Sequence, residues 1–136
     1  MIILNKESMT IVKEVDVIPF RNRLKEHALR IGLSLLNQTK IITAASELAR
    51  NMLKYAGGGT VEIEVVNRGL ENGLRLVFVD KGPGIKDIKL AMQDGFSTGK
   101  SLGLGLPGTK RLVSEFTIES EPGNGTKVTV IKWKNG

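Results

Sequence analysis

Glycine occupies seven of the 29 positions from 80 to 108, and this stretch constrains the fold more than any other. Glycine loses more conformational freedom on folding than other residues do, so such a stretch is poorly suited to the interior of a long helix or strand. Long loops inside compact domains are usually functional. We therefore expect a binding loop that is flanked on both sides by regular structure.

Two helices are predicted before the loop. Asp16 is placed to cap a helix over residues 17–30, where apolar residues recur at helical spacing and a glycine follows. A second helix is expected to begin at Ser34 or Asn37 and to run to about Tyr55. Its apolar stripe consists of Ile41, Ala45, Leu48, Met52 and Ala56.

Five strands and two shorter helices complete the pattern. The strands are predicted at residues 9–15, 60–67, 74–79, 116–120 and 127–133, and the helices at 88–92 and 106–115. The first strand has the composition of an edge strand, and residues 68–73 read as a hairpin turn. Hairpins imply antiparallel pairing, and so few helices cover only one face of a sheet. The predicted fold is a two-layer α/β sandwich with a mixed, mainly antiparallel sheet, in one domain over residues 1–136.

Composition narrows the class of protein. The chain has 136 residues, no cysteine and no stretch approaching the roughly 20 apolar residues of a membrane span, so we expect a cytoplasmic protein without disulfides. A net charge of +6 invites a nucleic-acid interpretation, but aromatic residues make up only 4% and the basic residues are dispersed. A basic surface suits an acidic protein partner or a polyphosphate equally well, and no nucleic-acid or membrane partner is expected.

Two familiar phosphate-binding motifs fit the glycine-rich stretch poorly. Residues 95–101 approach a P-loop, but only three residues separate the glycines, and Asp94 stands where the first glycine belongs. Residues 103–108 match the dinucleotide-binding pattern letter by letter, yet no strand is predicted directly before them. Neither motif explains the residues outside it.

A third interpretation uses several blocks together. Glu47 and Asn51 are four apart on the second helix and project from one side of it. Asp80 follows a buried strand, residues 103–108 open a later helix, and Thr126 begins the last strand. In this order and spacing, the blocks resemble those of the GHKL, or Bergerat, ATP-binding family, and the resemblance covers nearly the whole chain.

The resemblance implies a role for each block. The carboxylate of Asp80 would accept a hydrogen bond from the adenine amino group, and Gly82 and Gly84 would let the backbone approach the base. Asn51 would hold Mg²⁺ through its side-chain oxygen, and Glu47 would take the proton of an attacking hydroxyl. Without the resemblance, the sequence would indicate only that Asp80 is a turn residue and that Glu47 and Asn51 belong to a solvated helix face.

The remaining contacts implied by the resemblance are with the phosphates. The backbone amides of four residues would hold them: Gly103, Gly105, Leu106 and Gly108. Residues 94–102 would form a lid over ATP, with Ser97, Thr98 and Lys100 as phosphate contacts. Thr126 would lie on the adenine side. Such lids usually carry a Gly-Gly pair where this chain has Lys100 and Ser101, a departure that concerns the geometry of the lid.

Within the family, the motifs look most like those of the stand-alone kinases of bacterial partner-switching modules, in particular the stressosome switch kinases. That resemblance implies an ATP- and Mg²⁺-dependent serine/threonine kinase whose substrates are STAS-domain proteins and which alternatively binds a downstream phosphatase. The alternative is an anti-sigma factor that binds nucleotide with little or no turnover. His27, the only histidine, is expected to be a surface or half-buried polar residue rather than a phosphate acceptor.

Overall fold

A single five-stranded sheet forms one layer of the protein. The computed structural model describes residues 1–83 and 105–136, and the predicted helix at 88–92 lies outside them. The strand order is β1-β2-β3-β5-β4, and all four pairings are antiparallel. The strands are β1 (Ile2–Ile11), β2 (Gly59–Arg68), β3 (Glu71–Asp80), β4 (Glu115–Ser120) and β5 (Thr126–Trp133).

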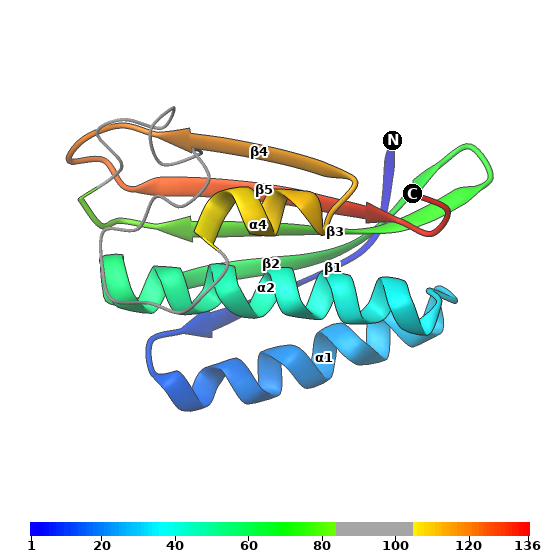
Figure 1. Cartoon of the computed structure of the whole chain (residues 1–136), viewed down its shortest axis with the longest axis horizontal. Helices are drawn as coiled ribbons and strands as arrows, with labels where there is room; N and C mark the ends of the chain where they lie inside the picture. The colour runs from blue at the N-terminus through cyan, green and yellow to red at the C-terminus, as the bar shows by residue number, and fades with distance from the viewer. Residues whose placement is uncertain (84–104) are drawn as a thin grey trace.

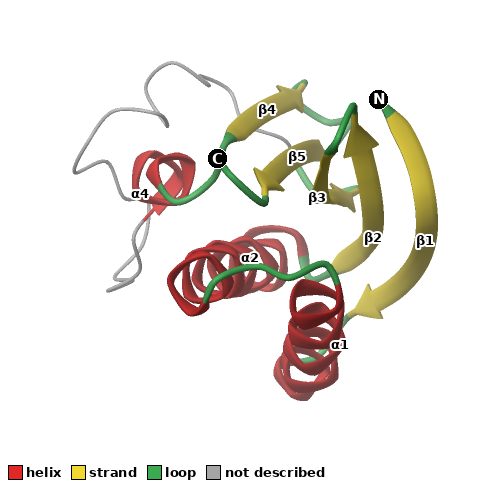
Figure 2. Cartoon of the chain, turned by 90° about the vertical axis from the view of Figure 1, so that its right-hand side faces the viewer, coloured by secondary structure: helices red, strands yellow, loops and turns green. Residues whose placement is uncertain are grey.

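The helices form the second layer. They are a short 3-10 helix η1 (Glu14–Asp16) and the α-helices α1 (Val17–Arg30), α2 (Leu35–Ala56) and α4 (Gly105–Arg111). Figure 1 shows α1, α2 and α4 lying across the strands, and Figure 2 shows them on one side of the curved sheet. The predicted two-layer architecture is therefore confirmed.

The core lies between the two layers. Alternate side chains of β2 face the helices because successive residues of a strand point to opposite sides, and Val61 and Ile63 are almost fully buried there. From α1, Phe20 meets Phe78 of β3 edge to face, with ring centroids 5.9 Å apart. The helical spacing in the sequence therefore identified the face of α1 that packs on the sheet.

Both long helices begin and end close to the predicted residues. Helix α1 has the expected bounds. The hydroxyl oxygen of Ser34 accepts a hydrogen bond of 3.1 Å from the amide of Asn37, which settles the two predicted starts of α2 in favour of Ser34 as the N-cap. Gly57 ends α2 with a φ of 75°, a left-handed conformation that favours glycine.

Several expectations at the ends of elements were wrong. Strand β1 is shifted toward the N-terminus of the predicted 9–15, because its pairing with β2 begins at Ile2. The carboxylate of Asp16 does not cap α1; it accepts hydrogen bonds of 3.0 Å from the amides of Val12 and Lys13. Helix α4 ends four residues early, because Glu115 already pairs with Ile131 in the sheet.

His27 is more buried than expected. Its side chain lies between α1 and β1, and its Nε2 is 2.7 Å from a carboxylate oxygen of Glu7. The same carboxylate accepts hydrogen bonds from Nε and Nη2 of Arg23, at 3.0 and 3.1 Å. This cluster ties the edge strand to the first helix.

Among the described residues, no helix is both long and apolar enough to cross a membrane.

Candidate functional site

Glu47 and Asn51 lie at the margin of the buried face of α2. The Glu47 side chain is 19% exposed and Asn51 is half-buried, so neither stands on a fully solvated face. Ala44, one turn before Glu47, is completely buried. Helix α4 packs against α2. The two polar side chains are therefore partly shielded from water, as groups that bind a ligand usually are.

Arg50 is the ionic partner of Glu47. Its Nη1 lies 3.6 Å from a carboxylate oxygen of Glu47, and its Nε donates a 3.4 Å hydrogen bond to Glu14 in η1. One guanidinium thus links α2 to the segment that joins β1 to α1. Arg50 was not among the predicted site residues, although its position three residues after Glu47 is a usual spacing of a helical ion pair.

Asp80 ends β3 and forms a turn. Its Oδ1 accepts a 2.9 Å hydrogen bond from the amide of Gly82, which is the local role that an aspartate often has in a turn. Within the two described segments, its Oδ2 has no hydrogen bond. The residue is half-buried. Its carboxylate therefore supports the turn with one oxygen, while the other makes no hydrogen bond to the described residues.

The turn at Asp80 packs closely against the end of α2. A Cβ added to Gly82 would lie 2.5 Å from the Cβ of Ala56, closer than two carbon atoms approach. A Cβ added to Gly59 would lie 2.9 Å from the sulfur of Met52 and 3.2 Å from the Cβ of Asp80. The last two turns of α2 and the end of β3 therefore form one neighbourhood, with Asn51 next to Met52 in the chain.

The turn between β4 and β5 closes the other side of Asp80. Thr126 pairs with Asp80 across β3 and β5. Gly125 has a φ of 83°, and a Cβ there would lie 2.1 Å from the carbonyl oxygen of Asp80. The Thr126 hydroxyl is 2.8 Å from that of Ser120. Thr126 is thus a neighbour of Asp80, and its hydroxyl already contacts the adjacent strand.

Helix α4 begins on the same side of the molecule as the end of α2 and the end of β3 (Figure 1). Gly105 has a φ of 69°, and its carbonyl accepts a 2.9 Å hydrogen bond from the buried hydroxyl of Thr109. Leu106 packs against the core. Five of the expected contacts lie outside the described residues: Gly84, Ser97, Thr98, Lys100 and Gly103.

The comparisons with known proteins decide the family. A family model described as "Histidine kinase-, DNA gyrase B-, and HSP90-like ATPase" matches residues 36–135. The chain belongs to this family. It is also 46% identical over 132 residues to the serine/threonine-protein kinase RsbT of Bacillus subtilis, a match that covers 96% of this chain and 98% of that one. This similarity confirms the predicted relation to the switch kinases and the predicted class of enzyme.

More distant relatives agree with this placement. An anti-sigma F factor of Caldanaerobacter subterraneus is 32% identical over 97 residues, which is 68% of each chain. The crystal structure of the RsbU and RsbW domains of Rv1364c from Mycobacterium tuberculosis matches with a TM-score of 0.66 and 21% identity, over 94% of this chain and 32% of that one. A mycobacterial sensor histidine kinase, MprB, matches with a TM-score of 0.56 and 18% identity, over 95% and 97%. These two structures support the fold alone.

Proposed function

We propose that this protein, as one domain over residues 1–136, is an ATP- and Mg²⁺-dependent kinase that phosphorylates serine or threonine in STAS-domain proteins of a bacterial partner-switching pathway. Its place of action would be the cytoplasm. The observation that carries the proposal is the 46% identity to a serine/threonine kinase over nearly the whole of both chains. The arrangement of α2 and the turn at Asp80 is consistent with it.

Asp80 is proposed to recognise adenine. The base presents an amino group, and the Oδ2 of Asp80 is available to accept a hydrogen bond from it. Thr126, its neighbour across the sheet, would border the same site. Gly82 already lies so close to Ala56 that a side chain there would displace the turn. Gly84, two residues later in the sequence, would let the backbone approach the base.

Asn51 and Glu47 are proposed to act on the phosphate side. Mg²⁺ takes few protein ligands and draws most of its oxygens from phosphate and water, so a single half-buried amide suits it. When bound, the ion would neutralise charge on the phosphates. Within the described residues, no three side chains of His, Cys, Asp or Glu gather into an alternative metal site.

The proposed transfer assigns the proton to Glu47. The hydroxyl oxygen of the acceptor attacks the γ-phosphorus, the bond from that phosphorus to the bridging oxygen breaks, and ADP leaves. The hydroxyl proton passes to the carboxylate of Glu47, whose ionic partner is Arg50. The amides of Gly103, Gly105, Leu106 and Gly108, with Ser97, Thr98 and Lys100, would contact the phosphates.

The test is transfer of labelled phosphate from ATP to candidate STAS proteins of the same genome in the presence of Mg²⁺. Glu47→Ala should still bind nucleotide but should lose most of the transfer, since removal of a general base costs about 10²–10⁴-fold in rate. Glu119→Ala, an exposed change on β4, is the control. Unchanged transfer by Glu47→Ala would show that the base is misassigned.

A second candidate is a nucleotide-dependent anti-sigma factor or binding module with little or no catalysis. The 32% identity to an anti-sigma F factor favours it. In that case, nucleotide would change the affinity for a protein partner, and Glu47→Ala would leave that affinity intact. The same preparation therefore distinguishes the two, by phosphate transfer on one side and partner affinity on the other.

A further inference from the structure

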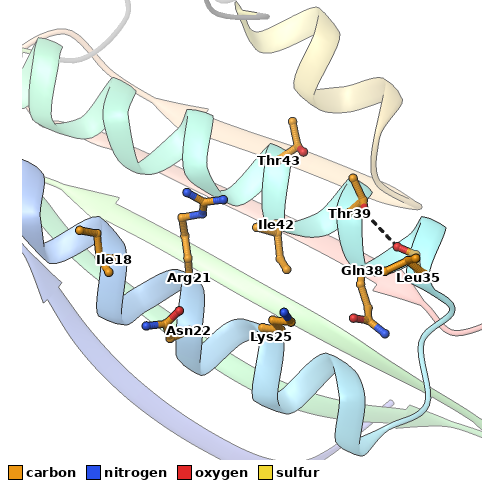
Figure 3. Close-up of a pocket in the computed structure, with 9 residues that line it drawn as sticks. All are labelled: Ile18, Arg21, Asn22, Lys25, Leu35, Gln38, Thr39, Ile42 and Thr43. Carbon is orange, nitrogen blue, oxygen red and sulfur yellow. Dashed lines mark hydrogen bonds between the residues drawn. The ribbon is translucent and has the colours of Figure 1, made fainter.

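Helices α1 and α2 leave a groove between them that opens to solvent. Its volume is about 430 Å³, and Figure 3 shows the residues that line it. Nine residues line it: Ile18, Arg21, Asn22, Lys25, Leu35, Gln38, Thr39, Ile42 and Thr43. Most of them are exposed. The groove lies on the helical layer, apart from the turn at Asp80.

Apolar side chains stand at both rims of this groove. Ile18 on α1 is 61% exposed and Leu35 on α2 is 78% exposed. Between them, Ile42 is half-buried and packs against the core, so it forms an apolar floor. Single exposed apolar residues are common, but several around one groove indicate an interaction surface.

Two cations line the groove. Arg21 and Lys25 are one turn apart on α1, and neither has an ion pair within the described part of the chain. Arg23, on another side of the same helix, pairs with both Glu7 and Glu26. None of the nine lining residues is acidic. The groove therefore has apolar contacts at Ile18, Ile42 and Leu35, uncharged polar residues between them, and a positive charge on its α1 side.

We infer that this groove docks an acidic amphipathic helix of a protein partner. A helix laid between α1 and α2 would place its apolar side chains on Ile18, Ile42 and Leu35, and its carboxylates opposite Arg21 and Lys25. A second copy of this chain suits the groove less well, because each copy carries a net charge of +6. Single-stranded nucleic acid would lack stacking partners, because no aromatic residue lines the groove.

The groove leads toward the proposed phosphate-transfer site. Thr43 lines its end, and Glu47 is the residue one helical turn further along α2. A helix docked here would bring the partner alongside the carboxylate that is proposed to receive the proton. This step rests on the proposed function, whereas the docking itself does not.

The first test measures docking without any phosphate transfer. The probe is a fluorescent synthetic helix with leucines spaced three and four apart and glutamates beside them, and binding is followed by anisotropy. Leu35→Asp should weaken binding about tenfold, because it removes an apolar contact at the rim and places a carboxylate beside the glutamates of the probe. Leu36→Asp is the matched control, because Leu36 is 64% exposed on the same turn but does not line the groove. An acidic residue in the first turn of α2 suits the helix dipole, so both variants should fold.

Charge is tested on the same probe. Lys25→Glu should weaken binding and reduce its dependence on salt, whereas Lys127→Glu, on β5, should change neither. A probe with lysines in place of the glutamates should not bind. The inference is overturned by failure of the glutamate probe to bind, by equal binding of the lysine probe, or by equal losses in the two leucine variants.

The second test uses a STAS protein that accepts phosphate. Leu35→Asp should raise KM for that protein about tenfold and leave kcat and KM for ATP unchanged. Unchanged KM for the protein would overturn this groove as the docking site of the phosphate acceptor and leave the kinase proposal intact. Conversely, probe binding with no transfer to any STAS protein would count against the kinase proposal alone.

Discussion

Two regions of this molecule are held together by different means. Around Asp80, the turn, the end of α2 and the start of β5 meet by close contact of backbones, at Gly82 and Gly125, where a side chain has no room. Between β1 and α1, Glu7, Arg23 and His27 meet through charge and hydrogen bonds. An added side chain should therefore destabilise the first region strongly, whereas a change of pH should affect its stability little. For the second region, we expect pH to matter and added side-chain volume to matter less.

The largest effect is expected from Gly125→Ala. The methyl group would overlap the carbonyl oxygen of Asp80 at 2.1 Å, and the residue would keep a left-handed φ of 83°. We expect a loss of about 3–5 kcal/mol in the free energy of unfolding, measured by urea denaturation.

Gly123→Ala provides the control for that variant. Gly123 belongs to the same turn and has a φ of 82°, but nothing lies within 4 Å of an added Cβ. Its cost should be only the conformational one, about 1–2 kcal/mol. If the two variants lost the same stability, the close contact with Asp80 would not be what holds this region together.

The second prediction separates the turn from the ligand. In Asp80→Asn, the amide oxygen can still accept the hydrogen bond from Gly82, so the unfolding temperature without nucleotide should change little. Nucleotide affinity should fall by roughly 1.5–3 kcal/mol, because a charged acceptor is lost and an amide can turn a donor toward the base. Titration with a fluorescent ATP analogue measures this loss, with Glu119→Gln as the control. If Asp80→Asn bound nucleotide with full affinity, Asp80 would not be the residue that recognises adenine.

Local patterns predicted the fold well where each element is determined by its own residues. Helix α1 has the expected bounds because the spacing of Phe20, Leu24 and Ala28 is strictly helical. Strand β1 was misplaced because residues 2–8 show no clear alternation, and their conformation follows from pairing with β2, more than 50 residues away. The end of α4 was predicted too late for the same reason, because Glu115 pairs with Ile131 of β5 instead of continuing the helix.

The candidate site was predicted in part. The family resemblance brought Glu47, Asn51 and Asp80 into one proposal, and the structure places the end of α2 against the turn at Asp80. Helical spacing alone did not show that Ala44 is buried, because burial depends on what packs against α2 in the fold. His27 was misjudged since its partner Glu7 lies 20 residues earlier, on a different element.

The smallest expected effect concerns pH and the charged region. Hydrogen bonds from Arg23 lower the pKa of Glu7 below its ordinary value of 4.5; contact with His27 adds to this effect, and burial opposes it. A carboxyl group with a lowered pKa in the folded state contributes stability above the unfolded pKa, and this contribution is lost as the pH falls from 4.5 through the folded pKa. In Glu7→Gln, the unfolding free energy should fall less steeply over this acid range than in the wild type, by about 1 kcal/mol at most, since Glu7 is partly exposed. Urea denaturation at about pH 7 and about pH 4 measures the difference.

Because the region around Asp80 depends on close contact instead, Gly125→Ala should lose the same stability at both values of pH. A parallel acid dependence in wild type and Glu7→Gln would show that the Glu7 cluster is held by packing after all, and the contrast between the two regions would no longer hold.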